Sequence, residues 1–338
     1  GTAALHLSAL AIGVDSQTNV ITTPITFAAS ANCIRYCGGN VWFADIDPIN
    51  YTLDLKKTEE LILSKPPHFF NGIIPVDFAG YPIDLEAFRR LADKHGLWII
   101  EDSCHAPGGS FIDSASNIQR CGNGSYADLA IFSFHPVKHI ATGEGGMITT
   151  NNPDLYKKLL LLRSHGITRD ASQFTNSSEF AVGSSSDAYP GWYMEMQQLG
   201  FNYRLTDFQA ALGISQLKRA DLGIEKRIKI AEKYNNTFCN CGFIKGQSGL
   251  VKGHAYHLYI IEVNNRLGLY NFLRENNTPK IIDYLSLDID LATTDCLSRL
   301  PLNEYTFKVI TIEHDAYRFG DGPRSAQRKI LTLSLIHI

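Results

Sequence analysis

The chain has 338 residues, with 31 Lys and Arg against 34 Asp and Glu and a formal charge of −3. Apolar residues make up 44% and charged residues 19%, which is typical of a globular protein with room for one large domain and a smaller one. The balanced charge leaves no basic surface for nucleic acid or an anionic membrane. No apolar run reaches the roughly 18 to 20 residues that a membrane-spanning helix needs. Seven cysteines without a CxxC pair argue against a disulfide framework or a zinc site, so we expect a reducing, cytoplasmic location.

Both ends of the sequence lack ordinary start and stop signals. Residue 1 opens directly into GTAALHLSALAIGV, which has helical spacing, and we interpret the start as an N-terminal truncation. The last residues, 334–338, fit a strand or a non-native extension equally well, and we assign them no role.

Short apolar segments alternate with helical stretches in the first half of the chain. After the opening helix, we expect strands at 19–24, 40–46, 71–78, 96–102, 127–134 and 145–152, and the last of these could run antiparallel. The intervening segments predict helices at 26–39, 53–63 and 85–96, with Gly96 as a C-cap. This alternation predicts βαβ units and a mostly parallel sheet covered on both faces.

The second half of the chain is more helical. We expect a helix at 154–166, a polar loop at 171–191, and a long helical stretch at 208–238 that breaks near 221–223. A strand at 254–263 and a helix at 267–276 then predict the start of a smaller domain.

Two residues with chemical potential follow neighbouring strands of the predicted sheet. Asp102 ends the strand at 96–102, and Lys138 comes just after the strand at 127–134. Ligands of open α/β sheets bind beyond the carboxyl ends of the strands. An amine and a carboxylate at such a place are what pyridoxal phosphate requires, because the lysine forms a Schiff base and the carboxylate keeps the pyridine nitrogen protonated.

The phosphate and the ring of such a cofactor also need partners. The opening helix offers the backbone N–H groups of Gly1, Thr2 and Ala3 to a phosphate. Phe27, just after the first strand, is positioned in the sequence to stack on the ring.

Each of these residues also has an ordinary structural explanation. An Asp after a strand is commonly a helix N-cap, and a loop Lys is commonly solvated. The segment TGEGG at 142–146 matches neither common phosphate-loop motif and fits a turn. His105, His135 and His139 fit packing or hydrogen bonding better than metal ligation, so no metal site is predicted.

The joint order of the motifs goes further than any single residue. The chain resembles the pyridoxal-phosphate-dependent sugar aminotransferases of the DegT/DnrJ/EryC1/StrS family over about residues 1–275. The matching stretches, in family order, are GTAALHL, TPITFAASANCI, FADIDPINYTLD, PVDFAGYPIDLEAF, EDSCHAPGGSF, SFHPVKHIATGEGGMITTNN, LRSHGITRD, GFNYRLTDFQAALGISQLKR and HAYHLYII.

This resemblance implies a fold and an organisation into domains. The fold is that of the type I pyridoxal-phosphate transferases, an α/β fold with a mostly parallel, seven-stranded type of sheet covered by helices. We expect a large cofactor-binding domain at 1–207, truncated at its N-terminus, and connecting helices with the start of an incomplete small domain at 208–278.

Within the family, the chain is most similar to the members that act in pseudaminic acid synthesis. The resemblance implies transfer of an amino group from glutamate to a UDP-linked 4-keto-6-deoxy sugar, in surface polysaccharide biosynthesis. It also implies a homodimer whose two subunits share their active sites.

The resemblance assigns a role to individual residues. Lys138 is the Schiff-base lysine and also moves the proton, while Asp102 contacts the pyridine nitrogen. The remaining assignments are His105 near the ring, Phe27 stacked on it, Thr2, Ala3 and Ser133 on the phosphate, and Asn202 and Arg204 reaching the neighbouring subunit. Tyr203 fits packing. Burial and nearby anions change the pKa of Lys138 in opposite directions, and the sequence leaves open which effect is larger.

The segment at 279–333 departs from the family. It resembles the middle of an FkbM-type methyltransferase, with strands in LSLDID and KVITIEHD and matching positions at Asp288, Asp290, Glu313 and His314. The glycine-rich loop for S-adenosylmethionine that should precede it is missing, so methyl transfer is not expected. Two alternatives to a sugar aminotransferase remain: an FkbM-like methyltransferase, and a non-catalytic homologue that binds a nucleotide sugar.

Overall fold

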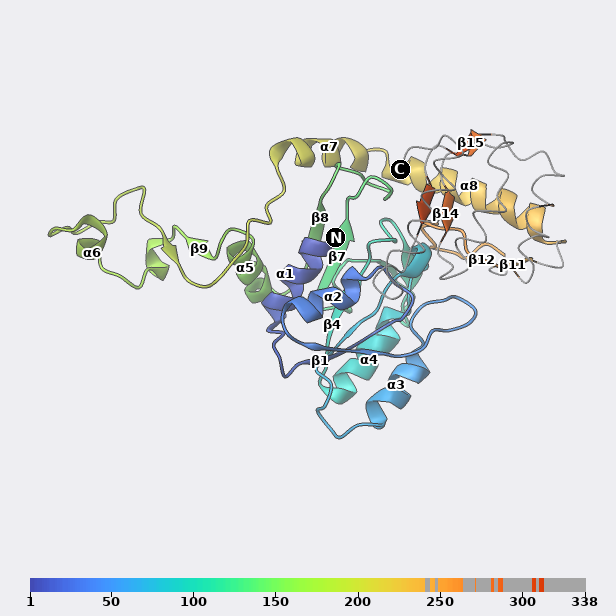
Figure 1. Cartoon of the computed structure of the whole chain (residues 1–338), viewed down its shortest axis with the longest axis horizontal. Helices are drawn as coiled ribbons and strands as arrows, with labels where there is room; N and C mark the ends of the chain where they lie inside the picture. The colour runs from blue at the N-terminus through green and yellow to red at the C-terminus, as the bar shows by residue number, and fades with distance from the viewer. Residues whose placement is uncertain are drawn as a thin grey trace, which may run out of the picture. The chain divides into compact units, whose positions relative to one another are not determined.

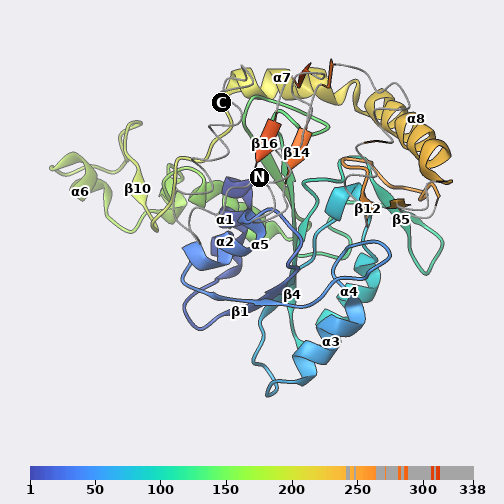
Figure 2. The same cartoon turned by 45° about the vertical axis from the view of Figure 1, so that its right-hand side comes forward.

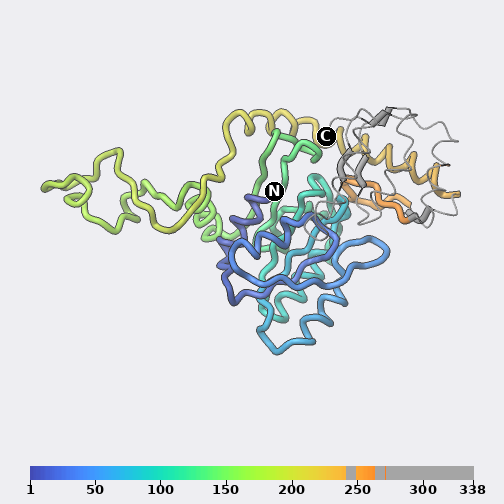
Figure 3. The backbone as a smooth tube through the Cα atoms, viewed as in Figure 1, coloured from blue at the N-terminus to red at the C-terminus, as the bar shows by residue number. Residues whose placement is uncertain are grey.

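The computed structural model describes residues 1–240, 249–263 and 271 (Figure 3). It also describes the backbone of short strands at 244–246, 281–282, 285–287, 306–307 and 310–312 (Figure 1). The chain divides into two compact units, Gly1–Glu262 and Val263–Ile338. None of the helices in these described residues has the length and apolarity that crossing a bilayer requires.

The first unit is built on a six-stranded sheet with the order β2-β1-β3-β4-β7-β8 (Figure 1). Its strands are β1 (Asn19–Thr22), β2 (Asn40–Phe43), β3 (Gly72–Ile74), β4 (Trp98–Asp102), β7 (Leu129–Ser133) and β8 (Gly146–Thr149). All neighbours are parallel except β7 and β8, which are antiparallel. The six predicted strands are confirmed, although the described sheet has one strand fewer than the resemblance implies. A hairpin of β5 (Ser110–Ile112) and β6 (Ile118–Arg120) was not predicted.

Helices cover both faces of this sheet (Figure 2). Residues of α1 (Thr2–Ile12), α2 (Ala29–Tyr36) and α5 (Pro153–Leu162) form one apolar core, and residues of α3 (Leu55–Leu63) and α4 (Leu85–His95) form the other. Side-chain caps start three of these helices, from Asp54, Asp84 and Asn152. Gly96 ends α4 in the left-handed conformation, as predicted.

Side chains alternate along β4, and this alternation determines which residues lie on each face of the sheet. Ile99 lies in the core beneath α3 and α4, and Ile100 lies in the core beneath α1, α2 and α5. Because side chains alternate along a strand, Glu101 follows Ile99 to one face and Asp102 follows Ile100 to the other. Ser133 of β7 shares the Asp102 face, since Leu129 and Ile131 belong to the core of that face.

The remainder of the first unit contains shorter elements and two long helices. The shorter elements are η1 (Phe78–Gly80), β9 (Ile167–Thr168), η2 (Ala171–Gln173), α6 (Ser178–Val182), β10 (Glu195–Met196), β11 (Ile244–Gly246) and β12 (Ile261–Val263). The long helices are α7 (Asp207–Leu217) and α8 (Ala220–Phe238). The helix break therefore comes at 218–219, earlier than predicted. Gly223 lies inside α8, where a glycine costs about 1 kcal/mol relative to alanine but is tolerated.

The predicted strand at 254–263 is wrong for most of its length, because only Ile261–Val263 is extended and paired. Tyr256 has a φ of +47°, which interrupts any strand. The segment instead hydrogen-bonds to η1: Ala255 N–H donates to the Gly80 carbonyl at 2.8 Å, and Leu258 N–H to the Ala79 carbonyl at 3.0 Å. These contacts are non-local, so the apolar pattern of the sequence could not show them.

The second unit contains short strands. β13 (Ile281–Ile282) pairs in parallel with β15 (Thr306–Phe307), and β14 (Leu285–Leu287) pairs in parallel with β16 (Ile310–Ile312). The strands expected in LSLDID and KVITIEHD are thus present. Apart from residue 271, the helix predicted at 267–276 lies outside the described residues, as do Asp288, Asp290, Glu313 and His314.

Candidate active site

Asp102 is the carboxylate at the end of β4, and it is 4% exposed. Its Oδ2 accepts a hydrogen bond from the Ser30 hydroxyl at 2.7 Å, and its Oδ1 accepts one from the Cys104 N–H at 3.2 Å. Its backbone continues the sheet, because Asp102 N–H donates to the Pro75 carbonyl at 2.9 Å. The carboxylate is therefore buried and held by two donors, instead of capping a helix.

Lys138 lies in the turn after β7, where its backbone N–H donates to the His135 carbonyl at 2.9 Å. It is half-buried and not solvated like an ordinary loop lysine. Burial lowers its pKa, and the nearby Cys104 and Asp102 oppose that effect in part. Burial is thus the larger of the two effects that the sequence left open, and Lys138 and Asp102 are close enough to interact electrostatically.

The N-terminus of α1 opens beside the end of β7. Gly1 is the N-cap, and its nitrogen donates to the Gly145 carbonyl at 2.9 Å. A Cβ added to Gly1 would lie 3.1 Å from the Ser133 hydroxyl, so this hydroxyl adjoins the first turn of the helix. Leu5 N–H makes the first hydrogen bond of the helix, to Gly1, and the N–H groups of Thr2 and Ala3 precede it. Free N–H groups at a helix start bind anions.

His105 is held between the backbone of η1 and another histidine ring. Its Nδ1 accepts the Ala79 N–H at 3.2 Å, which assigns the ring proton to Nε2. The His257 ring lies 4.3 Å away at 31°, centroid to centroid. Burial, together with the charges of Lys138 and His139, lowers the pKa of His105 to about 3. Gly80, at φ +95°, allows this packing, because a Cβ there would lie 2.8 Å from the His105 carbonyl.

Three other predicted residues are at the surface. Phe27 is 72% exposed, and its carbonyl accepts the backbone N–H of Ser30 at 3.1 Å, while the Ser30 hydroxyl binds Asp102. Asn202 and Arg204 are exposed in the loop before α7, where Asn202 forms a bridge to Ser164. Tyr203 between them packs as expected, with its ring 5.0 Å from Phe201 and its hydroxyl 3.3 Å from His6 Nδ1.

Several residues near the site were missed by the sequence analysis. Ser30 and Cys104 bind Asp102, and the signal that could have found them is their position one helical turn after Phe27 and two residues after Asp102. His257 was treated as part of a strand and contacts His105. His139 bonds through Nε2 to the Ala255 carbonyl at 2.8 Å, in line with the predicted hydrogen-bonding role.

The arrangement fits pyridoxal phosphate. The carboxyl edge of the sheet brings together a buried carboxylate, an amine of lowered pKa, and a helix start whose N-cap glycine lies against a hydroxyl. These are the donors and acceptors that a ring nitrogen, an aldehyde and a phosphate need. The fold and this set of residues define the class: a fold type I transferase that depends on pyridoxal phosphate.

Comparison with known proteins identifies the family. The profile described as the DegT/DnrJ/EryC1/StrS aminotransferase family matches residues 1–287, and the chain belongs to this family. Its members are sugar aminotransferases that use pyridoxal phosphate. An uncharacterized protein of Methanocaldococcus jannaschii is 35% identical over 295 residues, which cover 85% of this chain and 71% of that protein.

Two characterised relatives are also similar. The UDP-4-amino-4,6-dideoxy-N-acetyl-beta-L-altrosamine transaminase of Campylobacter jejuni is 39% identical over 237 residues, which cover 70% of this chain and 55% of that enzyme. The structure of Helicobacter pylori PseC, an aminotransferase of pseudaminic acid biosynthesis, matches with a TM-score of 0.65 and 29% identity. That match covers 79% of this chain and 65% of PseC. The chain thus spans less than two thirds of both enzymes.

Proposed function

We propose that this chain is a pyridoxal-phosphate-dependent aminotransferase that moves the amino group of glutamate to C4 of a UDP-linked 4-keto-6-deoxy sugar. The observation that carries the proposal is the half-buried Lys138 amine, which interacts with the buried Asp102 at the carboxyl edge of the sheet. The sugar and the nucleotide are proposed from the similarity to the Campylobacter transaminase and to PseC.

Each predicted residue has a place in holding the cofactor. Pyridoxal phosphate supplies an aldehyde that binds amines covalently and a ring that takes up electrons from the amine carbon. Lys138 Nζ would bind the aldehyde, and the Asp102 carboxylate would accept a hydrogen bond from the protonated ring nitrogen while Ser30 and Cys104 keep the carboxylate in place. The first turn of α1, from Thr2 and Ala3, and the Ser133 hydroxyl hold the phosphate. Phe27 and His105 would contact the ring.

Lys138 also moves the proton of the reaction. An amine works as a base near neutral pH only if its pKa is lowered, and burial lowers that of Lys138. Lys138 Nζ would therefore take the proton from the amine carbon of the donor. It would then deliver this proton to the other carbon that takes part in the transfer. Cys104 is not suited to this role, because burial raises the pKa of its thiol well above the usual value.

We propose that the enzyme acts as a homodimer in which Asn202 and Arg204 reach the neighbouring active site. Both residues are exposed in this chain. The helix that follows them, α7, buries none of its residues, and its Phe208, Ile214 and Leu217 are 91%, 60% and 62% exposed. Such an apolar surface is typical of an interface between subunits.

The domain boundaries and the tail are also proposals. We place the large domain at 1–207, connecting helices with the start of the small domain at 208–278, and an FkbM-like fragment without methyltransferase activity at 279–333. The family match ends at residue 287, within the fragment, and β14 and β16 pair with each other. The five cysteines of the described residues are free thiols. We also propose a cytoplasmic location.

The test follows the cofactor spectrum of the purified chain. With pyridoxal phosphate bound, addition of glutamate should convert the cofactor to its amine form, and a UDP-linked 4-keto-6-deoxy sugar should convert it back. GDP-linked sugars and alanine serve as matched controls for the nucleotide and the donor. If the chain binds the cofactor but reacts with no amino acid, the alternative of a non-catalytic homologue is correct.

A further inference from the structure

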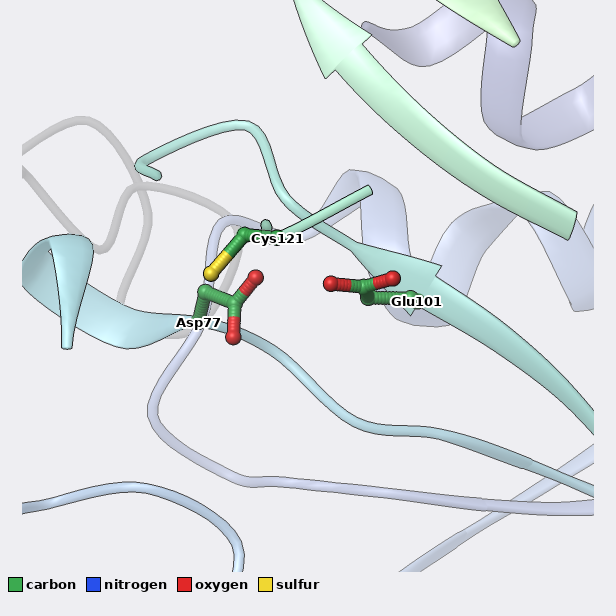
Figure 4. A group of neighbouring side chains, drawn as sticks. All are labelled: Asp77, Glu101 and Cys121. Atoms are coloured by element: carbon green, nitrogen blue, oxygen red, sulfur yellow. The ribbon is translucent and has the colours of Figure 1, made fainter. Parts of the chain in front are cut away.

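Two buried carboxyl groups lie on the face of the sheet opposite Asp102. Asp77 follows β3 and Glu101 belongs to β4, and each is 1% exposed. Their side chains point toward each other, with the Cys121 thiol beside them (Figure 4). Within the described residues, neither carboxyl group has a Lys, Arg or His nitrogen within 4 Å. Burial of two negative charges without a cation is very unfavourable.

The hydrogen bonds of this cluster require an additional proton. The Ser103 hydroxyl lies 2.7 Å from Asp77 Oδ2 and 2.8 Å from Glu101 Oε1. A hydroxyl has one hydrogen and can donate to one of these oxygens. The other contact is a hydrogen bond only if a carboxyl group donates to Ser103, so one of the two acids is protonated.

The backbone donors identify which acid holds the proton. Asp77 receives the Ser103 hydroxyl and also the Ile83 N–H, at 3.0 Å to Oδ1, so both of its oxygens have donors. Glu101 Oε1 receives the Gly122 N–H at 2.8 Å, while its buried Oε2 has no hydrogen-bond partner among the residues that the structure describes. A carboxylate with an unsatisfied buried oxygen is more costly than a neutral acid. Glu101 is therefore the better site for the proton.

The same network fixes the end of β4. Glu101 and Ser103 flank Asp102, and Asp77 N–H donates to the Asp102 carbonyl at 3.1 Å. Through Ile83 and Gly122 the network also holds the chain after β3 and the loop after β6. Gly122 has a φ of +76°, and a Cβ there would overlap the Phe132 ring.

We propose that Glu101 is a carboxylic acid in the folded protein, that it donates its proton to Ser103, which in turn donates to an ionised Asp77, and that this network positions Asp102. The statement about the proton is independent of the proposed function, whereas the statement about Asp102 rests on it. The titratable groups near the network are Cys121, which lies beside it, and Asp102, which is on the opposite face of the same strand. A metal ion held by Asp77, Glu101 and Cys121 is the alternative occupant, but three of the four carboxyl oxygens already receive protein donors.

The direction of the pKa changes agrees with this assignment. Burial raises the pKa of Glu101 well above its usual value, and the charge of Asp77 adds to the effect. Burial also raises the pKa of Asp77, to about 6, while the Ile83 and Ser103 donors oppose the rise. A folded chain that keeps a proton which the unfolded chain releases becomes less stable as pH rises.

The test compares Glu101→Gln with Glu86→Gln. Glu86 also accepts a Ser hydroxyl, from Ser114, but this bond lowers its pKa, so Glu86 is ionised. At pH 7 the infrared C=O band of a buried carboxylic acid should be present in the unaltered chain and in Glu86→Gln, and absent in Glu101→Gln. Between pH 6 and 8, unfolding of Glu101→Gln should release about one proton fewer than unfolding of the unaltered chain.

The outcomes are distinct. The proposed protonation of Glu101 is overturned if the unaltered chain shows no carboxylic-acid band at pH 7, or if the band persists in Glu101→Gln. The first of these measurements uses the unaltered chain and does not require that any variant folds. If Zn²⁺ or Mn²⁺ raises the midpoint of unfolding and Glu101→Gln abolishes that rise, the cluster holds a metal ion instead of the proton.

The positioning of Asp102 has its own readout. Ser103→Ala removes the shared hydroxyl and should weaken pyridoxal phosphate binding about tenfold, whereas Ser103→Thr, which restores the hydroxyl, should recover it. Equal binding by all three chains would overturn the positioning role and leave the protonation standing. If no chain binds the cofactor at all, the proposed function fails and the infrared result is unaffected.

Discussion

Asp102 and Glu101 are consecutive carboxyl groups on one strand, and they lie in opposite surroundings. Asp102 faces α1 and α2, accepts from Ser30 and Cys104, and interacts with the amine of Lys138. Glu101 faces the other core, and a second acid, Asp77, is its neighbour. Both are buried to a similar extent. At similar depth, the two acids therefore differ in what surrounds them, because Asp102 has an amine nearby and Glu101 has a second acid.

The largest expected difference between the two acids is in the rate of reaction. Asp102→Asn should slow the half-reaction with glutamate by about 10² to 10³-fold, because the cofactor ring loses the charge that holds its proton. Glu101→Gln, one residue away, stays neutral and should slow the reaction far less, although one Gln atom cannot both donate to Ser103 and accept from Gly122. Stopped-flow absorbance measures both. An unchanged rate in Asp102→Asn would mean that this carboxylate is merely structural.

A smaller effect is expected at the hydroxyl that holds Asp102. Ser30→Ala removes a hydrogen bond to a carboxylate, which is typically worth about 1.5 to 3 kcal/mol, so cofactor affinity should fall at least about tenfold. Ser8→Ala is the matched control, because the buried Ser8 hydroxyl has no hydrogen-bond partner in the described part of the chain. Its removal should leave affinity unchanged and stability equal or higher. Titration with pyridoxal phosphate and urea unfolding give the two values. Equal affinity in both variants would disprove the role of Ser30.

The smallest effect is expected on the pH dependence of stability, from the imidazole ring of His105 beside the site. The pKa of His105 is lowered to about 3, so the folded chain binds fewer protons than the unfolded chain between about pH 3 and 6.5. Stability should therefore rise with pH across this window. In His105→Gln the stability should rise less steeply with pH, by a slope that corresponds to up to about one proton. Its stability above pH 7 should be nearly unchanged. Unfolding midpoints from pH 4 to 8 measure it, and an identical slope in the variant would show that His105 does not hold its neutral form by burial.

The sequence was sufficient for the regular part of the fold. The strands of the main sheet and the capped helices depend on local patterns, such as Asp54, Asp84 and Gly96 at helix ends. The segment at 254–260 could not be predicted, because Gly80 and Tyr256 set its path through contacts that are distant in sequence. Secondary structure of this kind follows tertiary packing and not the apolar pattern.

The site was predictable in part for a similar reason. Asp102 and Lys138 stand where parallel strands end, so topology alone brings them to one edge. The network of Asp77 and Glu101 was missed, because a charged residue is expected to be exposed and the two positions are far apart in the sequence. Only the fold shows that these side chains meet behind the strand that carries Asp102.

The central claim is that Lys138 holds the cofactor, and the most direct measurement is reduction of the pyridoxal-phosphate-loaded chain with borohydride followed by peptide mapping. The account predicts a single covalent label on the peptide that contains Lys138. The label should be lost in Lys138→Ala and retained in Lys158→Ala, where the lysine of α5 bonds to the Ala11 carbonyl. A label of the same extent on another lysine, or one that persists in Lys138→Ala, would contradict the account.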